Sequence, residues 1–169
     1  YVYSGTAKDL EAELVFDRTS AAGGCSQREQ RARVAGFSGK LVLTYENSFS
    51  FACEAKRAGA LGVLTIWHAD LAHHGTLGGV WGTPEPEDLA WHYPGIPFAE
   101  IGKNAGEELQ KRLGSGPLTV RLSIEMCQGI VSSTMPVARI QGRSEKFVLV
   151  SGHYDSWYEG ATDNGVANA

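Results

Sequence analysis

The sequence predicts an α/β fold, and three features of the chain support this. Residues 41–45 and residues 62–67 are short apolar runs without polar alternation, a pattern typical of strands buried on both faces. Between them, residues 51–58 carry apolar side chains at helical spacing. Because strand–helix–strand units join parallel strands, we expect these two strands to be parallel neighbours linked by a right-handed crossover.

Two elements are expected before this unit. Tyr1–Ser4 is predicted to be a short strand. Ser26-Gln-Arg-Glu29 has the form of a capping box, in which a serine and a glutamate satisfy each other's backbone amides. It predicts a helix over residues 27–35.

The helix at residues 51–58 has recognisable ends. The candidates for its N-cap are Asn47, Ser48 and Ser50. Gly59 is the candidate for the left-handed residue that ends it. Its apolar face is expected to consist of Phe51, Ala55 and Ala58.

A second helix and two further strands follow. Residues 96–101 are predicted to form a strand, and Pro97 favours an edge position because proline cannot donate to a ladder. Asn104 is expected to cap a helix that runs to Leu113. The predicted apolar face of this helix is Ala105, Leu109 and Leu113. Residues 118–126 alternate apolar and polar side chains, which predicts a half-buried strand.

The least regular stretch is His68–Tyr93. The three residues His68, His73 and His74 could bind a metal. The alternative, which we favour, is a mobile polar loop, since long structureless loops are typically functional or disordered. Its aromatic residues either form a contact surface or pack inward; they are Trp81, Trp91 and Tyr93.

The C-terminal stretch carries the residues best suited to metal chemistry. Ser132–Gln141 and Lys146–Gly152 are predicted to pair as a hairpin, with Phe147–Val150 as a buried strand. His153 and Asp155 then share one face at the carboxyl end of that strand, where α/β sheets bind ligands. Imidazole and carboxylate groups suit zinc. The alternative is a solvated strand end with an Asx turn at Asp163-Asn164-Gly165.

The strings SGHYDSW and GATDNGVANA closely resemble the signature of zinc peptidase family twenty-eight. That family includes bacterial aminopeptidases and glutamate carboxypeptidase II. The resemblance implies that His153 ligates one metal, that Asp155 is the catalytic residue orienting it, and that Asp163 bridges two zinc ions. The family's later ligands have no counterpart in this chain. The isolated chain is therefore expected to bind no zinc stably and to be inactive, whereas the full-length parent holds two Zn²⁺.

The strings GFSGKLVLTYENSFSFACEAKRAGALGVLTI and GIPFAEIGKNAGEELQKRL are similar to the protease-associated domain. This resemblance covers about residues 1–125 and implies a β-rich α/β domain without chemistry of its own. It implies a protease-associated domain at residues 1–126 and the start of a zinc-peptidase domain at residues 127–169. The first domain is expected to act as a lid for substrate access. The alternatives are a non-catalytic interaction module and a receptor-like homologue that has lost its metals.

Charge and composition restrict the partners. The net charge of −4 argues against nucleic acid or an anionic membrane surface, and no apolar run is long enough to span a membrane. A peptide substrate and the remainder of the catalytic domain are expected partners, and oligomeric state stays open. The chain opens with Tyr1-Val2-Tyr3, as a mature fragment does. An extracellular or cell-envelope location is implied by the family resemblance alone.

The three cysteines match no zinc-finger spacing. They are Cys25, Cys53 and Cys127. A disulfide between Cys25 and Cys53 is one possibility, and three ordinary, partly buried thiols are the favoured alternative.

Overall fold

The structure, a computed structural model, describes residues 4–18, 35–71, 75, 94–127, 132 and 134–152. The chain divides into two units, Tyr1–Met126 and Cys127–Ala169. Of the residues described, those of the first unit form all the helices and strands. No helix among them is long and apolar enough to cross a bilayer.

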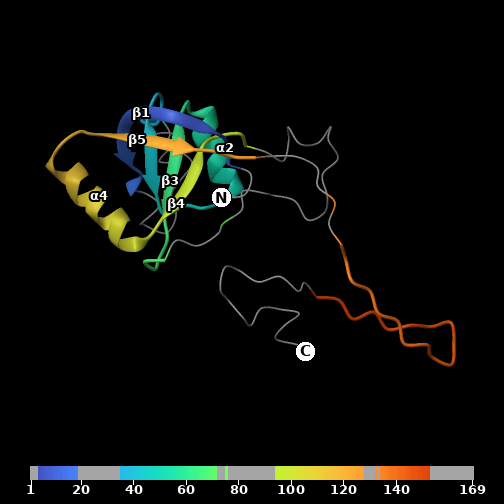
Figure 1. Cartoon of the computed structure of the whole chain (residues 1–169). Coiled ribbons are helices and arrows are strands. Elements are labelled where there is room, and N and C mark those ends of the chain that lie inside the picture. The colour runs from blue at the N-terminus through green and yellow to red at the C-terminus, as the bar shows by residue number, and fades with distance from the viewer. Residues whose placement is uncertain are drawn as a thin grey trace. The chain divides into compact units, whose positions relative to one another are not determined.

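The first unit is built on a five-stranded mixed sheet (Figure 1). The strands are β1 (Ala7–Phe16), β2 (Leu41–Thr44), β3 (Gly62–Ile66), β4 (Phe98–Ile101) and β5 (Leu118–Ile124). They lie in the order β4-β3-β2-β1-β5. The first four run parallel, and β5 runs antiparallel beside β1. The predicted α/β class is thus confirmed for this unit.

The predicted strand–helix–strand unit is present. Strands β2 and β3 are parallel neighbours, paired from Leu41 opposite Gly62 to Thr44 opposite Thr65. Helix α2 (Phe49–Arg57) connects them. Every residue of both strands is buried, as expected for parallel strands that are covered on both faces.

The ends of α2 follow the local sequence signals. The Ser48 hydroxyl accepts a hydrogen bond from the Phe51 amide at 3.2 Å, so Ser48 is the N-cap. Gly59 follows the helix with φ = 81°, a conformation that favours glycine. The Gly59 and Ala60 amides donate back to the carbonyls of the last turn, at 3.0 Å each. This pair of bonds is a Schellman motif, which confirms Gly59 as the residue that ends the helix.

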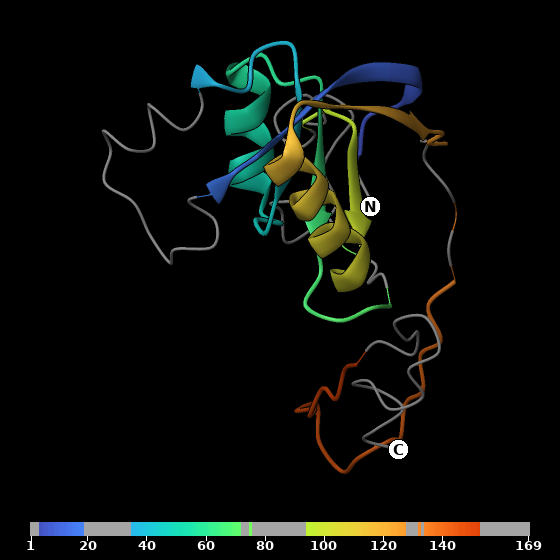
Figure 2. The ribbon, with the colours of Figure 1, turned by 90° about the vertical axis from the view of Figure 1, so that its left-hand side faces the viewer.

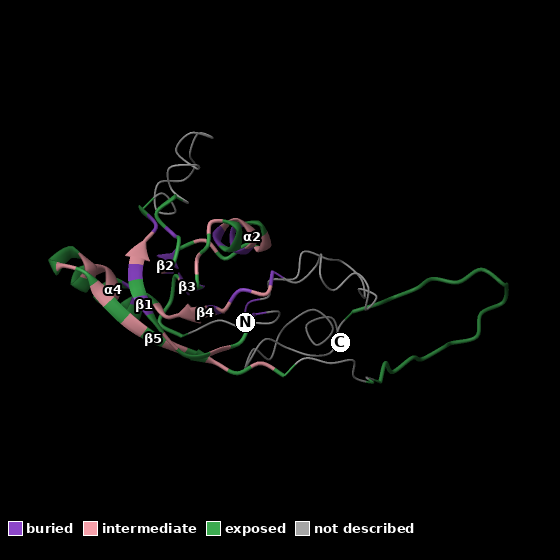
Figure 3. Cartoon of the chain, turned by 90° about the horizontal axis from the view of Figure 1, so that it is seen from above, coloured by how far each residue is buried: buried purple, intermediate pink, exposed green. Residues whose placement is uncertain are grey.

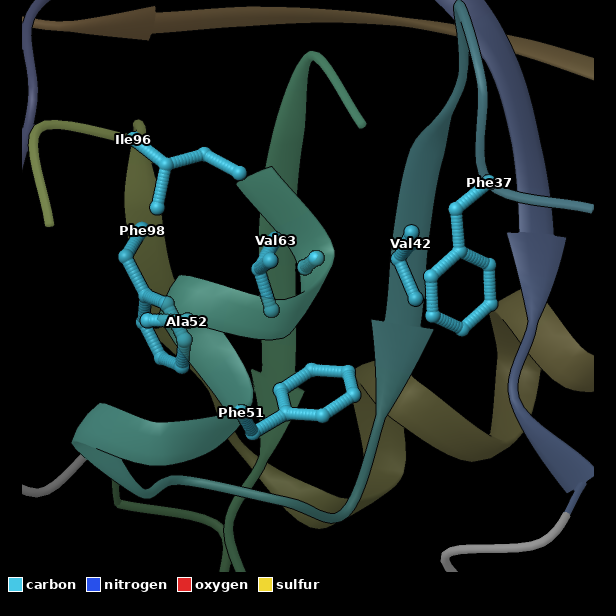
Figure 4. Close-up of a cluster of buried hydrophobic side chains, with 8 residues drawn as sticks. Phe37, Val42, Phe51, Ala52, Val63, Ile96 and Phe98 are labelled. Carbon is cyan, nitrogen blue, oxygen red and sulfur yellow. The ribbon is translucent and has the colours of Figure 1, made fainter. Parts of the chain in front are cut away.

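One hydrophobic cluster joins α2 to the sheet (Figure 4). Its buried members are Phe37, Val42, Phe51, Ala52, Ala55, Val63, Ile96 and Phe98. The Phe37 and Phe51 rings meet edge to face, with centroids 6.2 Å apart. Ala58 packs against the cluster, so the predicted apolar face of α2 is confirmed.

Helix α4 (Lys103–Ser115) packs on the opposite face of the sheet, as Figures 2 and 4 show. Leu109 and Leu113 join the second hydrophobic cluster as predicted, but Ala105 is exposed. The buried residue of this helix is Gly106, which faces Ile66 of β3. A Cβ at position 106 would lie 2.5 Å from Ile66 Cγ2, so the helix approaches the strand more closely than a side chain permits.

The cap predicted for α4 is wrong. Gly102, rather than Asn104, occupies the N-cap position, and no side chain of the helix's own start caps it. Instead the Asp70 carboxylate accepts a hydrogen bond from the Asn104 amide at 3.0 Å. The Lys103 amide donates to the Ala69 carbonyl at 3.0 Å. The segment after β3 therefore supplies the cap, which local spacing cannot show.

Two predictions for strands are confirmed. Strand β5 alternates half-buried and exposed residues, with Leu118, Val120, Leu122 and Ile124 on the covered side. Strand β4 lies at an edge of the sheet, as Pro97 suggested.

Strand β1 is an element that the sequence features did not predict. It pairs with β2 on one side and with β5 on the other, so it lies inside the sheet. Leu10, Ala12 and Leu14 pack into the second cluster, while Glu11 and Glu13 are exposed. This alternation has the period of a strand, but its alanine, leucine and glutamate residues favour helices.

The predicted N-terminal elements lie mainly outside the described residues. Tyr1–Tyr3 is not described, and Ser4 is not part of a strand. Ser4 is buried, and its hydroxyl accepts a hydrogen bond from the Phe98 amide at 2.8 Å. The predicted helix at residues 27–35 falls outside the described part except for Ala35.

The predicted C-terminal hairpin is wrong for the described part of the second unit. Residues 134–152 contain no strand and are exposed throughout (Figure 3). Phe147–Val150 has exposed fractions of 77–90%. A lone two-stranded hairpin is marginal in water, because each strand needs further neighbours and a covering layer. The described residues of this unit provide neither.

Candidate functional site

The predicted metal site cannot be located in this structure. His153, Asp155 and Asp163 all lie outside the described residues. Within the described ranges, no three histidine, cysteine, aspartate or glutamate side chains gather as a metal site. Of the three predicted loop histidines, only His68 is described; His73 and His74 are not. Cys53 and Cys127 are free thiols, and Cys25, the other cysteine of the possible disulfide, lies outside the described residues.

The described residues do form one candidate site in the first unit. A cavity of about 470 Å³ is lined by Tyr45, Asn47, Ile66, Trp67, His68 and Lys103. Tyr45 directly follows β2, Trp67 and His68 directly follow β3, and Lys103 begins α4. The cavity thus lies at the carboxyl ends of parallel strands, where α/β sheets commonly bind ligands.

Aromatic side chains form two walls of the cavity. The rings of Trp67 and His68 lie against each other, with centroids 4.1 Å apart. The Trp67 amide donates to the Ile101 carbonyl at 2.9 Å, which ties this segment to β4. Tyr45 is held by an edge-to-face contact with Phe16 and by a hydrogen bond that Gln110 Nε2 donates to its hydroxyl, at 2.9 Å. These walls are held by the fold before any ligand binds.

The charged end of the cavity is Lys103. Its backbone is anchored by the Ala69 carbonyl, and the next residue, Asn104, is bound through backbone and side chain to Asp70. The Lys103 ammonium lies 3.8 Å from the Glu107 carboxylate, and both side chains are more than half exposed. Such an exposed pair adds little stability, so the ammonium can turn toward a ligand at small cost.

A row of polar residues lies at the same end of the sheet on the face covered by α2. Thr44, Thr65 and Glu100 are register partners across β2, β3 and β4. The Thr44 hydroxyl donates to the buried Asp17 carboxylate at 3.0 Å. Thr65 Oγ1 is buried and has no hydrogen-bond partner among the described residues. Both faces of the sheet therefore carry polar groups where the parallel strands end.

The residues of this cavity were not predicted as a group. Tyr45 and Trp67 are the last residues of two predicted strands and His68 comes directly after the second; that position is the signal that could have found them. Lys103 likewise follows the predicted strand at residues 96–101, but the sequence does not show that this strand runs parallel beside β3.

A known protein family matches the C-terminal stretch. Residues 136–169 match the model for Peptidase family M28, and the matched segment includes His153, Asp155 and Asp163. No curated protein matches the chain.

Solved structures of two aminopeptidases resemble the chain weakly. The aminopeptidase from Aneurinibacillus sp. strain AM-1 aligns at 27% identity with a TM-score of 0.49, covering 72% of this chain and 26% of that one. The zinc aminopeptidase from Bacillus subtilis aligns at 21% identity with a TM-score of 0.45, covering 71% and 25%. At such TM-scores neither likeness establishes a shared fold. The chain spans about a quarter of the length of either aminopeptidase.

Proposed function

We propose that this chain is part of a secreted exopeptidase, an enzyme that removes terminal residues from peptides. The enzyme is proposed to use two zinc ions for this reaction. The observation that carries the proposal is the match of residues 136–169 to Peptidase family M28, since this segment holds the three residues of the expected metal site. Nothing in the segment distinguishes an aminopeptidase from a carboxypeptidase.

The roles proposed for these residues follow from their chemistry. His153 would hold one zinc ion through an imidazole nitrogen, and Asp163, with two carboxylate oxygens, would be shared between two. Asp155 would accept a hydrogen bond from the second ring nitrogen of His153 and so hold the ligating tautomer. Zinc held there would supply a water of lowered pKa and polarise the peptide carbonyl. Retention of all three residues weighs against a metal-free, receptor-like homologue.

The first unit is proposed to be a protease-associated domain that covers the approach to the active site. Its α/β architecture supports this assignment, and so does the fact that Tyr1–Met126 forms a compact unit of its own. Its hydrophobic clusters lie within the unit, as expected of a domain with its own core. It contributes no metal ligand in this proposal.

The test compares three single substitutions in the full-length protein. Asp163→Asn keeps the shape of the side chain but loses its charge. It should abolish removal of terminal residues from a short peptide with free ends, and lower the bound zinc, both measured by mass spectrometry. His153→Ala should remove most activity. Ser156→Ala, in the same stretch, is the matched control and should retain both zinc and activity.

Two results would contradict the proposal. Near-normal turnover and zinc content in Asp163→Asn would reject its bridging role. Metal-dependent turnover by the chain of residues 1–169 alone would reject the need for ligands beyond it, because a catalytic zinc site normally uses three protein ligands per ion.

A further inference from the structure

We propose that the cavity between Tyr45, Trp67 and Lys103 binds a small carboxylate with an aromatic or apolar side group. Such a ligand is either a free amino acid or the C-terminal residue of a peptide. The inference concerns a site in the first unit and does not depend on the proposed zinc chemistry. Its failure would leave that chemistry untouched.

The size and position of the cavity fit a small molecule. Its volume of about 470 Å³ lies within the range of about 300–1,000 Å³ that is typical of ligand sites. Residues that follow β2 and β3 and the first residue of α4 line it, and Ile66 at the end of β3 adds apolar surface. Backbone hydrogen bonds hold Trp67 to β4 and Lys103 to Ala69. Tyr45 is held through its side chain by Phe16 and Gln110.

The charge of the described residues that line the cavity favours an anion. Lys103 is the only permanently charged side chain among the described residues that line it, and none of them is acidic. The Asn47 amide adds a neutral donor and acceptor that can bind a second ligand oxygen. A carboxylate matches this pair, because charge-assisted hydrogen bonds from an ammonium are among the strongest available.

The rest of the lining selects an apolar or aromatic group on that anion. Trp67 follows β3 and Tyr45 follows the neighbouring strand β2, and both contribute aromatic surface to the lining of the cavity. Trp67 is only half-buried although it is a large aromatic residue, and Tyr45 has an exposed fraction of 39%. Exposed aromatic surface beside a cation fits a ligand that carries both a ring or alkyl group and a carboxylate.

The experiment uses the 169-residue chain and follows the Trp67 indole ¹H–¹⁵N signal during titration with N-acetyl-L-phenylalanine. Saturable shifts at Trp67 and His68 are expected. N-acetyl-L-phenylalaninamide, which lacks the carboxylate, should bind about tenfold more weakly, as expected for the loss of one charge-assisted hydrogen bond. Lys103→Gln should weaken binding of the acid to a similar degree. Lys111→Gln, an exposed substitution elsewhere on α4, is the matched control and should leave it unchanged.

Equal affinity for the acid and the amide would overturn the proposal, and so would undiminished binding by Lys103→Gln. Shifts confined to residues outside the cavity would overturn it as well. The acid–amide comparison needs no variant, so it decides the matter even if a substitution perturbs folding. Titration with L-phenylalanine distinguishes the sources: tighter binding than the N-acetyl compound identifies a free amino acid, and weaker binding identifies a peptide end.

Discussion

Strand β3 and the run Phe147–Val150 have similar sequences but opposite environments. The β3 residues GVLTI are all buried, whereas the FVLV run is exposed. Strand β3 lies between β2 and β4, with clusters on both faces that involve α2 and α4. The described residues of the second unit pair no strand with Phe147–Val150. An apolar run therefore indicates only a preference for burial. The neighbouring strands and helices decide whether the run is buried.

The largest expected effect comes from truncating one phenylalanine in each of the two units. Phe98 in β4 is fully buried, and Phe147 has an exposed fraction of 84%. Phe98→Ala should lower the free energy of unfolding of the first unit by about 3–5 kcal/mol, because it leaves a cavity in the core. Phe147→Ala should cause no measurable change. Urea denaturation followed by circular dichroism checks both, and equal effects would refute the contrast in burial.

The next effect tests how closely α4 packs on β3. Gly106→Ala should lower stability by about 1–3 kcal/mol, because the new methyl group meets the buried Ile66 side chain. Gly114→Ala in the same helix has open space around its Cβ and should raise stability by about 0.5–1 kcal/mol through helix propensity. Thermal melts of both variants provide the measurement. A stabilising Gly106→Ala would show that the helix can shift.

A smaller effect tests the N-cap of helix α2, which acts only on the first turn of that helix. Ser48→Ala removes the N-cap of α2 and should lower stability by about 1 kcal/mol. Ser50→Ala lies in the first turn and should be neutral or slightly stabilising, because alanine is the better helix former. Equal losses in both variants, measured by chemical denaturation, would reject the assigned cap.

The smallest effect concerns an exposed pair on α4. A hydrogen bond from Arg112, at 2.9 Å, is the main cause that lowers the pKa of Glu108 below its ordinary value. Because the folded-state pKa is depressed, the pair's contribution to stability is complete above the ordinary carboxyl pKa and disappears as pH falls through the lowered one. In an NMR titration, Arg112→Gln should raise the pKa of Glu108 more than Lys111→Gln does. The reverse order would reject Arg112 as the main cause.

Several elements could be predicted because their signals are local. The strands β2 and β3 are continuous apolar runs, and α2 has a serine at its start and a glycine at its end. Each signal acts through neighbours a few residues away, so the chain itself carries the whole cause. The candidate ligands His153 and Asp163, and Asp155 as the residue that orients His153, are likewise predictions from the sequence, through a short signature that lies in the matched segment 136–169.

Other features depend on contacts between distant parts of the chain. Strand β1 is held as a strand by β2 and β5, against the helical preference of its residues. The cap of α4 comes from Asp70, and the buried side of α4 is set by Gly106 against Ile66. The spacing of residues along the sequence does not predict such contacts, since the partners meet only after the sheet has formed.

By itself the sequence determined where the parallel strands β2 and β3 form and where the helix between them begins and ends, and it predicts which residues would bind a metal. Only the tertiary structure decided that Lys103 joins Tyr45 and Trp67 in one cavity, because α4 must pack on β3 before these residues meet. It also decided which apolar runs are buried. Burial is a property of a run together with the strands and helices that cover it, and the described residues around Phe147–Val150 do not cover that run.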